Sequence, residues 1–201
     1  MAEDLKEISC QILVIGGSAG SLDVLLGVFP GLSSAIDFPI LVVTHRKSGS
    51  DSLLTDLLQS RTMLKVIEAE EKMVLSPGKV YVAPADYHLL IEENKTLSLD
   101  YSEKVNYSRP SIDVTFHSAA EVFKDTLVCI LLSGSNADGV EGMKQANKFG
   151  AKLVIQNPKT AIMPFMPQQA ANQIEDVLIL DAGEMADFIN QLINNASGKE
   201  I

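Results

Sequence analysis

Cysteine is scarce in this sequence. The two that occur, Cys10 and Cys129, both lie inside apolar runs, at 10–15 and 127–132. Apolar neighbours favour buried thiols over a disulfide or a pair of metal ligands. The sequence therefore excludes a fold held together by disulfides and predicts a reducing, cytoplasmic setting.

Long apolar runs and an excess of positive charge are also missing. No run approaches the length of a membrane span, and residues 1–7 lack the basic start and apolar stretch of a signal peptide. The formal net charge is -10. These absences predict no membrane insertion and no general affinity for nucleic acid or anionic lipid.

What is present is the pattern of one α/β domain. The 201 residues contain no repeat, low-complexity tract or linker, so we expect a single domain over 1–201. Short apolar runs alternate with helical stretches. The strands are predicted at 11–15, 40–44, 65–68, 127–132, 152–155 and 177–180. The helices are predicted at 22–29, 51–60, 112–123, 139–149 and 184–194.

This alternation predicts a doubly wound, mostly parallel sheet with helices on both faces. Three further short runs, at 78–84, 87–92 and 96–99, are separated by proline, glycine and asparagine turns. They predict a small antiparallel excursion from the main sheet. Ser111 is placed to cap the helix that follows it.

Three chemically useful residues each follow a predicted strand. Ser18 stands in the glycine-rich turn 16–20, His45 closes the second strand, and Asp138 precedes Gly139 before a later helix. Each has an ordinary alternative: a helix-capping serine, a partly buried histidine and a turn carboxylate. Parallel strands place their carboxyl ends on one rim, so we expect the three side chains to meet there.

A hydroxyl, a base and an orienting carboxylate are the components of nucleophilic catalysis. The turn 16–20 resembles a nucleophile elbow with one extra glycine. The order Ser, His, Asp along the chain differs from the familiar hydrolase orders, but geometry rather than order defines a triad. The sequence therefore predicts a catalytic triad of Ser18, His45 and Asp138.

At these residues the sequence resembles the catalytic domain of the CheB family of chemotaxis receptor methylesterases. The resemblance runs from about Gln11 to Leu192. The matching motifs are Ile15-Gly-Gly-Ser-Ala-Gly20, Val43-Thr-His45, Val80-Tyr-Val-Ala-Pro84 with His88, Arg109-Pro-Ser-Ile-Asp113, Leu132-Ser-Gly134 with Asp138-Gly139, and Met166-Pro167. Their order and spacing together are more specific than any one of them.

The resemblance implies hydrolysis of glutamyl γ-methyl esters on chemoreceptor helices or another methylated protein, with glutamine deamidation as a further family activity. It implies Ser18 as nucleophile, His45 as base and Asp138 as its partner, and it implies no cofactor and no metal. Ala19, Ser135 and Met166 are the implied oxyanion or substrate-pocket residues. Family members often carry an N-terminal receiver domain and a linker; if Met1 is the true start, we expect this protein to lack both and a partner in trans to supply regulation.

The sequence also departs from the family pattern. Ser135 and Asn136 stand where the family has methionine and glycine, and Arg46 and Lys47 replace its methionine and proline. Phe165 and Ser21 stand where glycines are usual. We expect an altered pocket wall, and two cations that could attract an acidic substrate surface.

Two other functions stay open at this point. The departures suit a non-catalytic, CheB-like domain that binds partners. The glycine-rich turn suits a nucleotide-binding domain, although Ser18 interrupts the dinucleotide fingerprint and no acidic residue ends the second strand. A third hypothesis is a metal site formed by His88, Asp113 and His117. We prefer the interpretation that these residues lie on a helix surface or line a groove.

Overall fold

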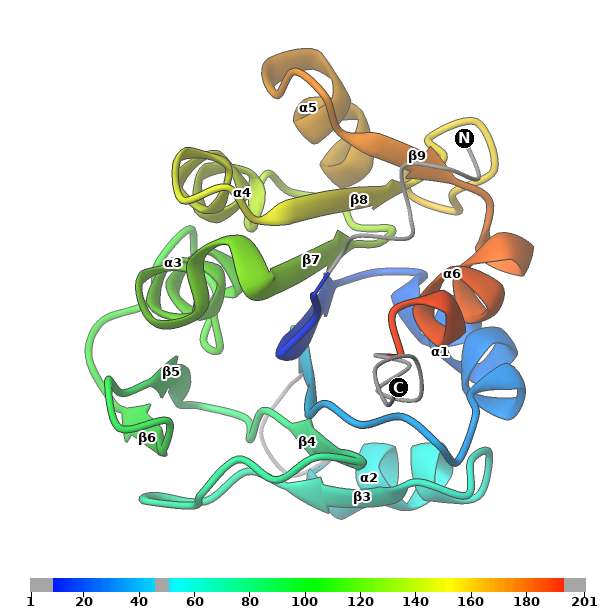
Figure 1. Ribbon diagram of the computed structural model, residues 1–201. Helices are drawn as coiled ribbons and strands as arrows, with labels where there is room; N and C mark the ends of the chain where they lie inside the picture. Colours follow the sequence, from blue (N-terminus) through cyan, green and yellow to red (C-terminus); the bar gives the residue numbers. More distant parts are fainter. Residues whose placement is uncertain (1–8, 46–50, 194–201) are drawn as a thin grey trace, which may run out of the picture.

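The computed structural model describes residues 9–45 and 51–193. A seven-stranded sheet runs through the centre in the order β3-β4-β2-β1-β7-β8-β9, and all neighbouring strands are parallel (Figure 1). The strands are β1 (Ile12–Gly17), β2 (Ile40–Thr44), β3 (Lys65–Glu68), β4 (Lys79–Val82), β7 (Leu127–Leu131), β8 (Lys152–Gln156) and β9 (Leu178–Leu180).

Helices cover both faces of this sheet, as the sequence predicts. They are α1 (Ser21–Val28), α2 (Asp51–Gln59), α3 (Ile112–Phe123), α4 (Val140–Lys148), α5 (Phe165–Gln173) and α6 (Met185–Gln191). Alternate strand residues divide the core in two. Val14 packs on the side of α3, α4 and α5, and Leu13 packs on the side of α1, α2 and α6.

The three central strands, β2, β1 and β7, are buried along their whole length. Their continuous apolar runs are those of parallel strands covered on both faces. β1 lies between β2 and β7, so the chain leaves it in one direction along the sheet and later returns on its other side. Such a reversal is where α/β proteins place their sites, at the carboxyl ends of the strands.

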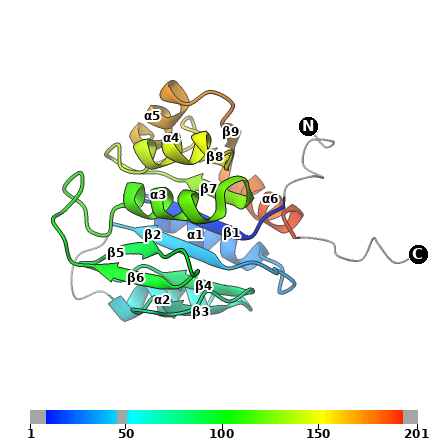
Figure 2. The same ribbon diagram turned by 60° about the vertical axis from the view of Figure 1, so that its left-hand side comes forward.

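The antiparallel excursion is smaller than predicted. β5 (His88–Ile91) and β6 (Leu97–Asp100) form a two-stranded antiparallel pair, which lies beside α3 (Figure 2). The prediction was wrong for the run 78–84, because β4 pairs in parallel with β2 and β3 in the main sheet. Val80, Tyr81 and Val82 are all fully buried, which marks an interior strand despite the turn residues on either side.

The sequence analysis also missed α5, since Pro164 and Pro167 interrupt its helical pattern. Both prolines lie at or before the first turn of the helix, where no intrahelical N–H bond is lost. The cysteine prediction is confirmed, because Cys10 and Cys129 are both buried. Among the helices in residues 9–45 and 51–193, none is both long and apolar enough to cross a bilayer.

Candidate active site

Ser18 occupies the tight turn between β1 and α1. Its N–H donates to the carbonyl of Ser133 at 2.9 Å, and its carbonyl accepts from the Ser21 hydroxyl at 2.7 Å. Gly20 has φ 81°, a conformation that favours glycine. A side chain at Gly17 would lie 2.5 Å from the Ser21 Cβ. The two glycines therefore let the chain turn sharply and leave the Ser18 hydroxyl partly exposed.

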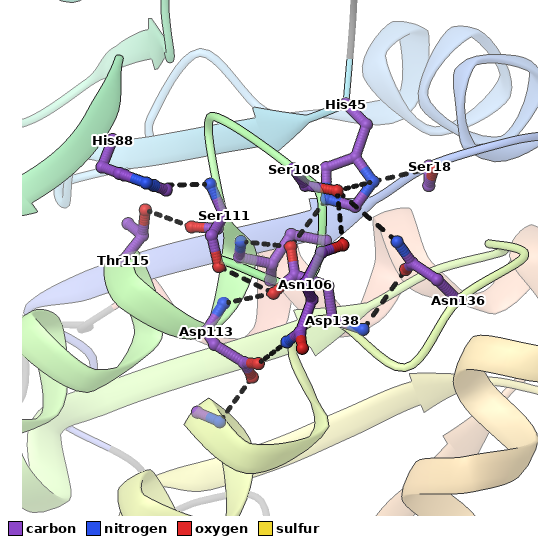
Figure 3. Close-up of polar contacts among 12 residues, drawn as sticks. Ser18, His45, His88, Asn106, Ser108, Ser111, Asp113, Thr115, Asn136 and Asp138 are labelled. Atoms are coloured by element: carbon purple, nitrogen blue, oxygen red, sulfur yellow. Dashed lines mark hydrogen bonds and ion pairs between the residues drawn. The ribbon is translucent and has the colours of Figure 1, made fainter. Parts of the chain in front are cut away.

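His45 follows the last residue of β2 and faces Ser18 (Figure 3). Its Nδ1 lies 3.1 Å from the Ser18 Oγ, and its Nε2 lies 2.6 Å from the Asp138 Oδ2. A carboxylate only accepts, so Nε2 carries the ring proton and Nδ1 presents its lone pair to the serine hydroxyl. The ring is thus used in the opposite sense to the familiar serine-protease triad, where Nε2 faces the serine.

Asp138 is fully buried and holds four hydrogen bonds. Besides His45, its oxygens accept from the Ser111 hydroxyl at 2.8 Å, the Ile112 N–H at 2.8 Å and the Asp113 N–H at 3.1 Å. Burial alone would raise the pKa of Asp138, but these bonds together hold it below its usual value. The carboxylate therefore stays ionised opposite the imidazole.

The N-terminus of α3 supplies two of those donors. Ile112 and Asp113 are its first residues, and their N–H groups have no acceptor within the helix itself. The helix dipole adds a favourable positive potential at this end. Ser111 does occupy the capping position, but its side chain makes no capping bond and reaches Asp138 instead. Asp138 thus caps a helix distant in sequence.

Asp113 is a second buried carboxyl beside Asp138. Its Oδ1 accepts from the Gly142 N–H at 2.7 Å and its Oδ2 from the Asn106 amide at 2.9 Å. Burial and the neighbouring Asp138 charge raise the pKa of Asp113 to about 6, despite the Gly142 bond. The two carboxyls therefore differ in charge state near pH 5, with the proton on Asp113.

Sequence reasoning missed Ser108 as a neighbour of His45. Its Oγ lies 3.3 Å from His45 Nδ1 and 3.5 Å from the Asn136 amide nitrogen (Figure 3). Ser108 closes a tight turn in which Asn106 and Tyr107 both have positive φ. The Asn-containing turn was a readable signal, but nothing in the sequence indicated that it would lie against His45.

The predicted oxyanion residues lie in two segments, Ala19 directly after Ser18 and Ser135 in the loop that follows β7. Within residues 9–45 and 51–193, the N–H groups of Ala19 and Ser135 have no hydrogen-bond acceptor. Met166 is fully buried beneath Gly134, where a side chain would lie 2.5 Å from its Cε. Met166 therefore supports the loop that carries Ser135 and does not itself face the cleft.

An apolar pocket of about 220 Å³ adjoins Ser18. Ser18 and His45 form one wall, and leucines of α1 and α2 form the others, at Leu22, Leu53, Leu54 and Leu57. None of these leucines was singled out from the sequence as a site residue. The sequence predicted only the two helices, at 22–29 and 51–60, on which they lie.

The metal idea finds no support in the placement of its residues. The His88 Nδ1 accepts from the Ser111 N–H at 3.1 Å, and its Nε2 lies 3.0 Å from the Glu103 carbonyl. His117 lies beside Glu121 on the surface of α3. Across the part of the chain that the structure describes, no three His, Cys, Asp or Glu side chains are grouped to hold a metal.

The departures from the family pattern fall in different places. Ser21 is buried and fixes the turn at Ser18. The Asn136 Oδ1 accepts from the Asp138 N–H at 3.2 Å, so it braces the carboxylate loop. Phe165 is half exposed at the start of α5. Arg46 and Lys47 lie outside the described residues, so their expected role stays a prediction.

A hydrogen-bonded serine, histidine and carboxylate at the carboxyl edge of a parallel sheet is the arrangement of α/β serine hydrolases. Comparison with known proteins narrows this class. The CheB methylesterase family model matches residues 13–189. This chain therefore belongs to the CheB methylesterase family.

Individual relatives agree with this assignment. A Leptospira interrogans protein, named as a candidate protein-glutamate methylesterase/protein-glutamine glutaminase, is 39% identical over 92% of this chain and 96% of its own length. The Thermotoga maritima protein-glutamate methylesterase/protein-glutamine glutaminase is 31% identical over 92% of this chain, which spans only 55% of that relative. The crystal structure of the Thermotoga maritima CheB methylesterase catalytic domain matches with a TM-score of 0.86 and 31% identity, over 92% of this chain and 100% of that one.

Proposed function

We propose that this protein hydrolyses glutamyl γ-methyl esters on methylated chemoreceptor helices or another methylated protein. The continuous chain of hydrogen bonds from Ser18 through His45 to Asp138 carries this proposal. Membership of the CheB methylesterase family supports the choice of ester. The proposed catalytic unit is the single domain 1–201, and the proposed setting is the cytoplasm, where buried thiols such as Cys10 stay reduced.

In the proposed mechanism, Ser18 Oγ attacks the ester carbonyl while His45 Nδ1 takes its proton. The buried Asp138 carboxylate stabilises the imidazolium that forms. His45 then passes the proton to the departing methanol. Water attacks the acyl-enzyme by the same route in reverse, which gives a glutamate and restores the Ser18 hydroxyl.

The Ala19 and Ser135 N–H groups are the proposed oxyanion donors. Their lack of other acceptors within the described chain supports this role. Each such donor is worth roughly 3 kcal/mol of transition-state stabilisation in other hydrolases. Because the donors are backbone groups, the unusual Ser135 and Asn136 side chains leave them in place.

The test is methanol release from a methylated chemoreceptor fragment of the same cell. Wild type and the exposed-serine control Ser34→Ala should release methanol equally, and Ser18→Ala should release none above background. Release no higher than background by both wild type and Ser18→Ala, with both proteins folded, would instead support the non-catalytic alternative.

Glutamine deamidation is the second proposed activity. The relatives from Leptospira and Thermotoga carry it in their names, and attack on an amide uses the same acyl-enzyme route. A chemoreceptor fragment with glutamine in place of the methylated glutamate should release ammonia with wild type but not with Ser18→Ala.

A further inference from the structure

The two flanks of the Ser18–His45 pair differ in polarity. On one flank, the Ser108 hydroxyl approaches the reactive Nδ1 of His45, and the Asn136 amide in turn approaches the Ser108 hydroxyl. On the other flank, the cavity of about 220 Å³ is walled by Leu22, Leu54 and Leu57. The Ser21 hydroxyl also borders this cavity, but it is already bonded to the Ser18 carbonyl.

Each flank suits one part of an ester. The hydrolytic water needs hydrogen-bonding partners beside the base, and the Ser108 and Asn136 flank provides them. An apolar cavity holds water poorly, so it suits a group that stays in place through both half-reactions. The acyl group does so, because it remains bonded to Ser18 after the alcohol has left.

The cavity is larger than a methyl ester requires. Its volume of about 220 Å³ is roughly seven times the space that a water molecule occupies in the liquid. Leu53, which is 70% exposed, and Leu22, which is 40% exposed, stand at its rim, so the cavity opens to solvent. Covering large apolar side chains at a cavity mouth with a ligand removes them from water and so favours binding.

We propose that this leucine pocket is an acyl-binding pocket, and that the enzyme therefore also hydrolyses simple esters with aliphatic acyl chains of about four to six carbons. The inference rests on the proposed role of Ser18 as nucleophile. Ser18 Oγ bonds to the acyl carbon, the bond to the alcohol oxygen breaks, and the serine proton passes through His45 to the leaving group. Water then cleaves the acyl-enzyme and releases the carboxylic acid, with the serine hydroxyl restored.

The experiment measures kcat/KM for the p-nitrophenyl esters of acetate, butyrate and hexanoate, with Ser18→Ala as the blank. The leaving group is constant, so only the acyl chain changes. Moving two more methylenes from water into the pocket should raise kcat/KM about tenfold from acetate to butyrate. A further rise is expected at hexanoate.

Filling the pocket should reduce the preference for longer acyl chains. In Leu57→Phe the added ring atoms occupy the cavity, so the ratio of hexanoate to acetate kcat/KM should fall about tenfold. Leu22→Phe, on the other helix, is an independent variant in case the first fails to fold. The matched control is Ile179→Phe, on the half-exposed face of β9, which should keep the wild-type ratio.

Each outcome is decisive for one statement. Ser18-dependent hydrolysis that is no faster with longer chains overturns the acyl pocket and leaves the esterase standing. The absence of Ser18-dependent hydrolysis with all three esters also overturns the pocket proposal, while methanol release from the receptor fragment judges the proposed function separately. A chain-length preference that survives both phenylalanine variants places the acyl chain elsewhere.

Discussion

At the scale of single residues, Asp138 organises the site. It joins the loop between β7 and α4 to His45 and to the start of α3 through four hydrogen bonds. The sequence could predict Ser18, His45 and Asp138 together because each follows a strand. It could not predict Ser108 or the bond from Ser111 to Asp138, because both depend on how a loop folds back over the sheet edge.

Ser111→Ala should shift the pH dependence of the site. The folded pKa of Asp138 is lowered, so its ionised form stabilises the fold above the unfolded pKa, and this stability is lost as pH falls through the folded value. Loss of one charged hydrogen bond should raise that pKa and cost about 2 kcal/mol of unfolding free energy at pH 7. The stability lost on acidification should be correspondingly smaller in the variant, because its Asp138 pKa lies nearer the unfolded value.

Urea unfolding at pH 7 and at a series of pH values down to about 2 measures both effects. Ser118→Ala is the matched control, because this serine is also buried on α3 but bonds to Thr115 and Ile91 and not to Asp138. It should lose stability at pH 7 and keep the wild-type loss of stability on acidification. A wild-type loss on acidification in Ser111→Ala would contradict the role assigned to this hydroxyl.

Asp113→Asn tests a dependence of stability on pH that is opposite in sign to that of Asp138. The folded pKa of Asp113 is about 6, above its usual value of 3.8, so stability should be highest when the group is protonated and should fall as pH rises from about 4 to 6. A shift of this size corresponds to something of the order of 3 kcal/mol.

The neutral amide should remove this fall while its oxygen still accepts from the Gly142 N–H. The exposed Asn106 amide can rotate to keep the second bond. Unfolding free energies at pH 4.5 and 7 measure the slope in both proteins. The same decline with pH in the variant would show that Asp113 is not its source.

At the scale of elements, the position of α3 depends on its close packing against α4. Gly142 of α4 approaches the backbone of Asp113 so closely that a Cβ would lie 2.8 Å from the Asp113 Cα and carbonyl oxygen. The apolar pattern predicted both helices with accurate bounds. It did not reveal this contact, since one glycine within a helix gives no sign of what lies opposite.

Gly142→Ala should therefore destabilise the protein by about 1–3 kcal/mol, because backbone atoms cannot move aside easily. It should also lower kcat by shifting the N–H donors of Asp138. Gly27→Ala is the matched control, since no atom lies within 4 Å of the added Cβ on α1. That change should stabilise the fold by roughly 0.5–1 kcal/mol. Thermal or urea unfolding of the pair decides between steric and propensity effects.

At the scale of the whole molecule, the site stands on the most buried strands. β2, β1 and β7 are neighbours at the centre of the sheet, and the segments that follow them carry the three candidate catalytic residues. The alternation of strands and helices predicted a parallel sheet with helices on both faces. The order of its strands, and the place of β4 within it, are set by contacts between distant segments and could not be inferred from local pattern.

Amide hydrogen exchange should reflect this arrangement. Backbone amides in β1, β2 and β7 should exchange slowest, because those strands are fully buried and open only on global unfolding. β9 lies at the edge and is partly exposed, so its amides should exchange much faster. Mass spectrometry of peptic fragments measures both, and equal protection of β9 would contradict the expected gradient.

Because Asp138 caps α3, its proposed catalytic role and its contribution to the stability of the fold are linked. Active-site residues commonly lower the stability of a protein, so that replacing them often raises its free energy of unfolding. Asp138 instead orients His45 and also stabilises the start of α3, so selection for stability and selection for the proposed activity both favour keeping it. If the activity were lost during evolution, Ser18 would therefore be expected to change before Asp138. A relative that keeps the aspartate without the serine would be a former enzyme in which the aspartate still stabilises the helix.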